Sequence, residues 1–493
     1  MSNAESPNIV IIMTDQQRAD FFRSEGFAWD TMPFVDELGR RGVRFRRAYT
    51  PIPVCGPART SMFTGRFPKA TRVRENSALG HVVRPDDLID VLRSRGYSVN
   101  LAGKNHTYRK REDFDFASLY NHRGGGRPER QSELHREFDG WLKRIPFQLS
   151  LEPAPYPVEA HLVHRIVDDA IECLRTRDER PFFLWLSIPE PHPPYEAPEP
   201  YYSMFSAAEA PARFAGPEGA EAKGGKWRWA RRLIEEKYPR YDEVWRRYRA
   251  VYCAMIRMVD DEVRRFVSYL EESGNLENTI LIFTSDHGDY AGDYGLHRKG
   301  VSLPECLVRI PMLFVGPGIE PQEAPSDAFV SLVDIMPTLC EAIGAPVPHG
   351  VQGRSLWPLL TGGEYPKEEF RSIYAEVGVG GAPYGEAERP PLHFPYEGRA
   401  FDSLNAFTQS GKEKMVRLGD WKLVYDVMGR GELYDLSRDP GELDNLYDDP
   451  AYAAVRIKLL EEMLRWTIRA EDDLPAGDYA QKRVERNWYA ALE

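Results

Sequence analysis

One cysteine stands where chemistry could be done, in the stretch PVCGPARTSMFTG that runs from Pro53 to Gly65. Pro57 fixes the backbone at a predicted helix start, so free backbone N–H groups and the guanidinium of Arg59 lie close to Cys55. These surroundings favour an anion, and they can lower the pKa of a thiol enough to make it a nucleophile. The alternative is a small, buried, inert cysteine, which is the commoner role of a free thiol.

Three unbroken apolar runs of strand length end in polar residues that can also do chemistry. They are NIVIIMTDQ, PFFLWLSIPEPH and TILIFTSDHGD. Unbroken runs are typical of strands buried on both faces of a parallel sheet. Because ligands bind beyond the carboxyl ends of such strands, we expect five side chains to converge on one sheet edge: Asp15, Gln16, His192, Asp286 and His287. Asp15 and Asp286 would repel each other there unless a cation lay between them, which predicts a divalent metal.

Helical patterns separate the apolar runs, for example RPDDLIDVLRSRGY and HLVHRIVDDAIECLRTR. This alternation predicts an α/β fold with a mostly parallel central sheet sandwiched by helices. A Gly- and Pro-rich stretch from about Gly378 to Pro395 predicts a long loop. Short alternating runs after it, and a helical pattern near Tyr452 to Glu471, predict a smaller α+β subdomain. We therefore expect a catalytic domain at residues 1–380 and a C-terminal subdomain with a short antiparallel sheet and a helix at residues 381–493.

The composition excludes several classes of function. The chain has 493 residues, of which 42% are hydrophobic, and a formal net charge of −12 without a basic stripe, so we expect no nucleic-acid partner. We expect no membrane span, because no apolar run reaches about 18 residues. The five cysteines have no metal-binding or disulfide-scaffold spacing. No export signal is visible, so we expect a cytoplasmic location unless a leader has been removed. The oligomeric state stays open.

The motif at Cys55, extended through Thr64 and Gly65, resembles the C-x-P-x-R signature of type I sulfatases, members of the alkaline-phosphatase-like superfamily. In that family the cysteine is oxidised after translation to formylglycine. The resemblance implies the fold of that superfamily, and it implies a formylglycine-generating enzyme as a partner that acts on Cys55. It covers nearly the whole chain, because RLGDWKLVYD and ELYDLSRDPGELDNL are similar to the family's C-terminal appendage.

The resemblance also implies a metal site. NIVIIMTDQQRAD looks like the family's first strand with its metal-binding acid, and SDHGDYAGDYGLHRKG looks like the second metal-binding element. The implied metal site consists of Asp15, Gln16, Cys55, Asp286 and His287. Gln16 and His287 stand where the family commonly has a second Asp and an Asn. An uncharged amide and an imidazole move the preference toward Mn²⁺, although Ca²⁺ is the ion that we favour.

Other family motifs place the remaining site residues. GYSVNLAGKNH is similar to the family's G-K-x-H segment, PHPPY supplies a histidine at a strand end, and the second metal-binding element ends in a lysine. The implied catalytic residues are Cys55, Arg59, Lys104, His106, His192 and Lys299, and the implied substrate-binding residues are Lys104, His192, Lys299 and Asn76. No motif contains the other histidines, of which only His297 and His393 neighbour segments expected to line the pocket.

The resemblance implies hydrolysis of sulfate monoesters, on a small-molecule or glycan substrate such as an aryl or carbohydrate sulfate. In this hypothesis the formylglycine is hydrated, and one hydroxyl, its pKa lowered by the metal and Arg59, attacks sulfur. Lys104 and Lys299 hold the sulfate oxygens. His192 protonates the leaving alcohol, and His106 is the base that lets the second hydroxyl expel sulfate.

Two alternatives remain open at this point. A phosphonate monoester or phosphodiester hydrolase of the same superfamily shares the fold and the cysteine, and it also resembles this chain in Gln16 and His287. A metal-dependent binding protein of the same fold, with an unconverted Cys55, is the non-hydrolytic alternative.

Overall fold

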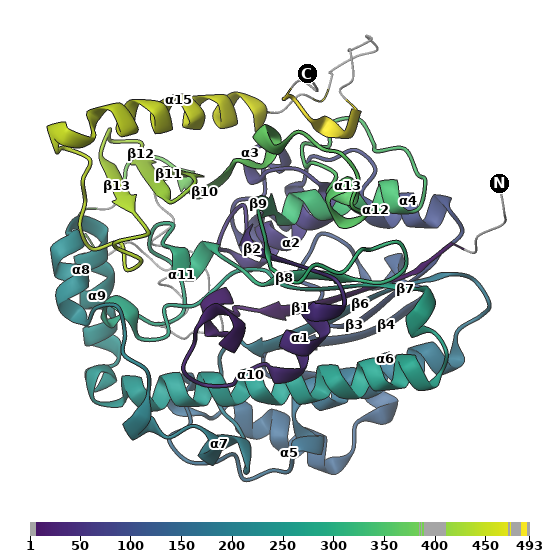
Figure 1. Cartoon of the computed structure of the whole chain (residues 1–493). Helices are drawn as coiled ribbons and strands as arrows, with labels where there is room; N and C mark the ends of the chain where they lie inside the picture. The colour runs from purple at the N-terminus through teal and green to yellow at the C-terminus, as the bar shows by residue number, and fades with distance from the viewer. Residues whose placement is uncertain are drawn as a thin grey trace.

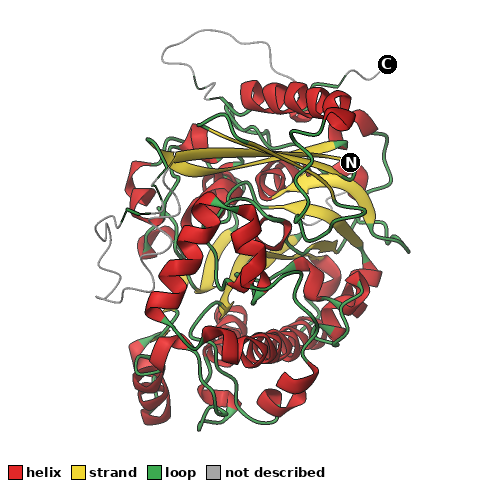
Figure 2. Ribbon diagram, turned by 90° about the vertical axis from the view of Figure 1, so that its left-hand side faces the viewer, coloured by secondary structure: helices red, strands yellow, loops and turns green. Residues whose placement is uncertain are grey.

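A nine-stranded sheet with mostly parallel strands crosses the middle of the protein (Figures 1 and 2). The computed structural model describes residues 6–383, 385, 387–388, 411–471, 474 and 485–490. The strand order is β5-β4-β3-β6-β1-β7-β8-β2-β9. The strands are β1 (Asn8–Asp15), β2 (Val43–Tyr49), β3 (Ser98–Gly103), β4 (Phe116–Asn121), β5 (Gly124–Gly125), β6 (Phe182–Pro191), β7 (Thr279–Ser285), β8 (Met312–Val315) and β9 (Ser326–Ser331).

The five strands from β4 to β7 in this order run parallel, which confirms the predicted α/β fold. Their apolar runs are unbroken because both faces of the sheet are covered. Along β1, Ile9 and Ile11 belong to one hydrophobic core and Val10 and Ile12 to the other. One core includes α6 and α10, and the opposite core includes α2, α4 and α12, so helices cover both faces.

The helices connect these strands and form the outer layers (Figure 1). The bounds are α1 (Pro33–Leu38), α2 (Cys55–Thr64), α3 (Pro68–Thr71), α4 (Leu88–Ser94), α5 (Glu133–Leu142), α6 (Leu162–Thr176), α7 (Tyr201–Met204), α8 (Pro217–Lys223), α9 (Gly225–Lys237), α10 (Tyr241–Glu272), α11 (Glu305–Val308), α12 (Ile335–Ala342), α13 (Trp357–Leu360) and α15 (Ala453–Arg469). No described helix is both long and apolar enough to cross a membrane.

A second, antiparallel sheet lies beside the first and has the order β10-β11-β12-β13. Its strands are β10 (Ser372–Gly380), β11 (Gly411–Leu418), β12 (Trp421–Asp426) and β13 (Gly431–Asp435), and α15 packs on it. The sheet begins at Ser372, upstream of the predicted domain boundary at residue 380, and that boundary stays a prediction. Half of the predicted Gly- and Pro-rich loop lies outside the described residues, and its first residues, Gly378 to Gly380, belong to β10 instead of a loop.

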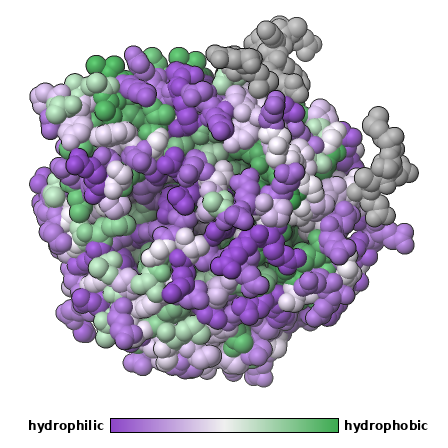
Figure 3. Space-filling view, in the orientation of Figure 1, coloured by the Kyte–Doolittle hydropathy of each residue, from purple (hydrophilic) through white to green (hydrophobic). Residues whose placement is uncertain are grey.

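The outer face of α15 exposes three aliphatic side chains, Ile457, Leu464 and Ile468. Hydrophobic atoms also gather in the region of α15 in the space-filling view, in which hydrophilic residues otherwise cover much of the surface (Figure 3).

A buried ion cluster joins the second sheet to the start of α11. The ammonium of Lys422, on β12, lies 3.1 Å from Glu305, at the start of α11, and 2.7 Å from Glu442. It also donates a hydrogen bond of 2.6 Å to the carbonyl oxygen of Leu303. Lys422 is completely buried, so it compensates Glu442 in a medium that screens charge poorly, and it shares the compensation of Glu305 with Arg417 at 2.7 Å.

Replacing Lys422 by methionine keeps the length of the side chain but leaves Glu305 and Glu442 buried without this cation. We expect Lys422→Met to lower the free energy of unfolding by about 3–5 kcal/mol, measured by urea denaturation. Lys458→Met, on the exposed face of α15, is the control and should change it by less than about 0.5 kcal/mol. Equal losses in the two variants would contradict a compensating role for Lys422.

Candidate active site

A set of buried polar side chains meets at the carboxyl ends of the central strands and the start of α2. Thr14 of β1 pairs with Ser285 of β7, so the residues that follow these two strands emerge side by side. All members of the set are at most 6% exposed: Asp15, Gln16, Cys55, Arg59, Lys104, Asp286, His287 and Lys299. The structure therefore brings together the whole predicted metal set and three of the predicted catalytic residues that are not metal ligands.

Arg59 holds the two strand-end carboxylates. It lies one turn after Cys55 on α2, and its Nε donates to Asp286 at 2.8 Å while its Nη2 donates to Asp15 at 3.2 Å. Its Nη1 donates to the hydroxyl of Ser187, on β6, at 2.7 Å. Burial alone would raise the pKa of Asp15, but the charges of Lys104, His192 and Arg59 outweigh it and hold this pKa well below its usual range.

The donor set fits a divalent cation. Possible ligand atoms of Asp15, Cys55, Asp286 and His287 lie within 4.8 Å of one another. The Nδ1 of His287 donates to the carbonyl oxygen of Gly288 at 2.9 Å, so Nε2 keeps its lone pair for a metal. That Nε2 lies 3.8 Å from a carboxylate oxygen of Asp15 and 3.6 Å from one of Asp286. Two carboxylates, an amide and an imidazole suit Ca²⁺ or Mn²⁺.

Gln16 is oriented by a carboxylate that the sequence reasoning did not single out, Asp289. The Nε2 of Gln16 donates to Asp289 at 2.5 Å and to the hydroxyl of Tyr195 at 3.0 Å. Its Oε1 therefore faces the opposite way, toward the ammonium of Lys299 at 3.3 Å. Asp289 itself accepts hydrogen bonds from the hydroxyls of Tyr195 and Tyr248. The last residue of SDHGD is Asp289, and that acidic position was the available sequence signal.

Two lysines lie next to Cys55. The ammonium of Lys299 is 2.8 Å from its Sγ and 2.9 Å from the Nε2 of His287. Lys104 forms an ion pair with Asp15, whose other oxygen is 3.6 Å from Sγ. Burial and Asp15 raise the pKa of the Cys55 thiol, but Lys104, Lys299 and His287 together hold it well below its usual range.

Gly103 allows Lys104 to reach this position. It has a φ of +116°, and a Cβ at Gly103 would clash with the carbonyl oxygen of Ser187. The next residue, Lys104, donates its backbone N–H to the same carbonyl at 2.8 Å. A glycine therefore lets β3 end against β6 with the lysine side chain turned into the site.

Three half-buried histidines lie around the site: His106, His122 and His192. The side chain of His106 interacts electrostatically with Cys55. The Nδ1 of His192 donates to the carbonyl oxygen of Pro193 at 2.8 Å, which leaves Nε2 available. Sequence motifs predicted His106 and His192 for the site but not His122, which follows β4.

Asn76 lies beside the site, where its side chain stabilises the start of α2. Its carboxamide oxygen accepts the backbone N–H of Gly56 at 3.0 Å, which satisfies a free donor in the first turn of α2. The predicted substrate-binding role of Asn76 stays a prediction. His297 is buried against Tyr241, and His393 lies outside the described residues.

The family model described as Sulfatase matches residues 7–345. This chain belongs to the sulfatase family. An arylsulfatase of Clostridium perfringens is 29% identical to it over 488 residues, which cover 93% of each chain. The multifunctional alkaline phosphatase superfamily protein PehA of Trinickia caryophylli is 28% identical over 515 residues, with 94% of this chain and 96% of the relative covered. A crystal structure of the phosphonate monoester hydrolase of Agrobacterium radiobacter superposes with a TM-score of 0.77 at 27% identity, covering 94% of this chain and 96% of that one.

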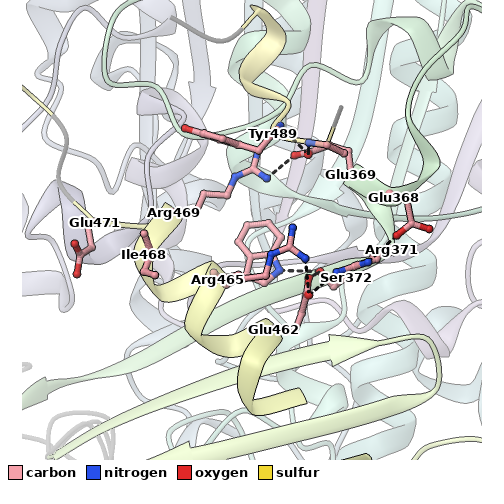
Figure 4. A pocket seen from close by; sticks show the side chains of 12 residues that line it. Glu368, Glu369, Arg371, Ser372, Glu462, Arg465, Ile468, Arg469, Glu471 and Tyr489 are labelled. Carbon is pink, nitrogen blue, oxygen red and sulfur yellow. Dashed lines mark hydrogen bonds and ion pairs between the residues drawn. The ribbon is translucent and has the colours of Figure 1, made fainter. Parts of the chain in front are cut away.

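A cavity of this sulfatase lies away from these residues, between α15 and residues 489–490 (Figure 4). It has a volume of about 520 Å³. Its charged groups pair with one another: Arg371 with Glu462 at 2.8 Å, and Arg469 with Glu369. None of the residues predicted to do chemistry lines this cavity.

In the sulfatase, Asp289→Asn should weaken metal binding. The backbone N–H groups of Ala291 and Arg298 donate to Oδ1, so the new amide oxygen would take that position and its NH₂ would face Gln16. Gln16 would then turn its own NH₂ toward the metal. We expect the dissociation constant for Mn²⁺ or Ca²⁺ to rise about 10- to 100-fold, measured by calorimetric titration of chelator-treated protein. Asp178→Asn, at an exposed carboxylate, is the control, and an unchanged constant in Asp289→Asn would contradict the role of Asp289.

Proposed function

We propose that this sulfatase hydrolyses sulfate monoesters, of the aryl or carbohydrate class, at a formylglycine made from Cys55 by a formylglycine-generating enzyme. The observation that carries the proposal is the pair of buried ammonium groups beside Cys55. Lys299 lies 2.8 Å from its Sγ, and Lys104 pairs with Asp15 on the other side. Two fixed positive charges in a buried site stabilise the oxygens of a bound sulfate ester in the transition state.

The proposed cation site and the proposed formylglycine lie next to each other. A formylglycine hydrate supplies the nucleophilic hydroxyl, and a divalent cation at Asp15, Gln16, Asp286 and His287 supplies the positive charge that lowers the pKa of this hydroxyl. We favour Ca²⁺, because three of these four residues offer oxygen ligands. The imidazole of His287 makes Mn²⁺ the alternative.

His192 and His106 carry out the proton transfers in this proposal. His192 keeps Nε2 available because Nδ1 donates to Pro193, so a proton on Nε2 can pass to the leaving alcohol oxygen. His106 interacts electrostatically with Cys55, and we assign to it the proton that residue 55 loses when sulfate is released. General acid catalysis of this kind contributes about 10²- to 10⁴-fold.

A phosphonate monoester hydrolase is the second candidate. An ester of a phosphonic acid carries one negative charge, as a sulfate monoester does, so the two lysines suit both. The amide and imidazole of Gln16 and His287 resemble that branch, and the superposition with the phosphonate monoester hydrolase supports it.

Intact-mass analysis tests the modification. We expect active protein to be lighter than the encoded chain by about the mass of one water, with the difference located at residue 55, because the aldehyde replaces the thiol. Cys55→Ala should reduce hydrolysis to the background rate, since alanine has no group that can be converted. Cys173→Ala, at a buried cysteine of α6, should keep both the mass difference and the activity. A fully active enzyme with an unmodified Cys55 would contradict the proposal.

Side-by-side kinetics decide the substrate class. We expect kcat/KM to be higher for 4-nitrophenyl sulfate than for the 4-nitrophenyl ester of methylphosphonic acid, both measured by phenol release on metal-loaded, modified protein. A large preference for the phosphonate would favour the second candidate. No turnover of a broad panel of esters by modified, metal-loaded protein would favour a binding protein.

A further inference from the structure

His122 contacts two of the predicted catalytic residues although no sequence motif contains it. It is the first residue after β4, so it reaches the site from a strand that supplies none of the predicted residues. Its ring stacks on the ring of His192, with centroids 3.5 Å apart and planes inclined by 16°. The residue thus covers one face of the imidazole that is proposed to protonate the leaving group.

The second contact is with Lys104. The ammonium of Lys104 lies 2.9 Å from the Nε2 of His122. Because an ammonium group can only donate, Nε2 accepts and neutral His122 carries its own proton on Nδ1. This Nδ1 is buried and has no hydrogen-bond partner among the described residues. Lys104 is in turn paired with Asp15, so the stack is connected to the metal-binding carboxylate through one side chain.

A neutral His122 ring allows the stacked ring of His192 to be protonated. Two protonated imidazoles 3.5 Å apart would repel each other. Burial holds the pKa of both rings well below its usual range, so the hydrogen bonds decide which ring takes a proton. The bond from Lys104 occupies the nitrogen at which His122 would gain one, whereas the Nε2 of His192 is left available by the bond from Nδ1 to Pro193. We therefore assign a proton in this stack to His192.

Among the described residues, the hydrogen bond of the His192 ring is the one from Nδ1 to the carbonyl oxygen of the adjacent Pro193. One hydrogen bond at one ring atom restrains the χ2 torsion of the ring only in part. Stacking against His122 restrains this torsion further and so helps to fix the direction of Nε2.

We propose that His122 is a positioning residue for leaving-group protonation, which holds the plane of His192 and the ammonium of Lys104 in one arrangement. The inference rests on the proposed function, in which His192 is the general acid. It assigns to His122 no contact with the reacting atoms.

The test is a leaving-group series. kcat/KM is measured for sulfate esters from 4-nitrophenol, through phenol, to a simple alkyl alcohol, in the metal-loaded, modified enzyme and in His122→Ala. Protonation matters little for 4-nitrophenol and much for an alcohol. We expect a loss of about 10-fold or less with the nitrophenyl ester and a loss at least about 10-fold greater with the alkyl ester. An equal loss for all leaving groups would overturn the proposal.

Two further variants separate the contacts. His122→Phe keeps the stacked ring but has no acceptor for Lys104, and His122→Gln keeps an acceptor but loses the ring. If the ring plane of His192 is what His122 fixes, the phenylalanine variant retains more of the activity on the alkyl ester than the glutamine variant does. The reverse order, or no difference between the two, would contradict that role.

The double variant gives an independent measurement. The part of the effect that depends on the leaving group acts through His192. Adding His122→Ala to His192→Ala should therefore cost no more on the alkyl ester than His122→Ala costs on the nitrophenyl ester. Full additivity of the two losses would overturn the proposal. His349→Ala, at a half-buried histidine in the loop after α12, should leave the leaving-group dependence unchanged.

The same series with esters of methylphosphonic acid separates this inference from the proposed function. The relative rates of the parent enzyme on the two ester classes test the function. The change in leaving-group dependence, in whichever class the parent turns over, tests His122. A phosphonate preference with the expected change would reject the sulfate proposal and retain the role of His122.

Discussion

The site depends on one buried guanidinium between two buried carboxylates. Asp15 and Asp286 follow neighbouring strands and are completely buried, which would be costly without compensation. Arg59 donates to both of them and to Ser187. It therefore offsets the charge and also fixes α2 against β1, β6 and β7. Since Cys55 lies one turn earlier on the same helix, the interaction that neutralises the acids also sets the place of the reactive residue.

Much of this arrangement could be predicted from the chain. An unbroken apolar run ending in a polar residue indicates a parallel strand, and the carboxyl ends of parallel strands share one edge, so Asp15 and Asp286 were expected to meet. The spacing of Cys55 and Arg59 places both on one side of a helix start. Lys104 and His106 were found through a family motif, because a lone lysine or histidine carries no such signal of its own.

The remainder depends on contacts that have no pattern in the sequence. His122 enters the site because β4 pairs with β3, and a strand order cannot be read from apolar runs alone. Asp289 is turned toward Gln16 by backbone and tyrosine donors from several elements. Asn76 accepts the backbone N–H of Gly56 in the first turn of α2. A sequence motif cannot distinguish this helix-stabilising role from a contact with substrate. β10 begins at Ser372 and pairs with β11, which lies far along the chain. No local pattern therefore marks Ser372 as the start of the second sheet.

The burial of Cys55 determines when it can be modified. Only 2% of this residue is exposed in the folded protein, and its Sγ is in contact with Lys299 and His287. A modifying enzyme would have no access to Cys55 once α2 has packed. Under the proposed function, conversion of Cys55 would therefore have to precede the packing of this helix. Folding of an unconverted chain would seal the thiol inside a finished site.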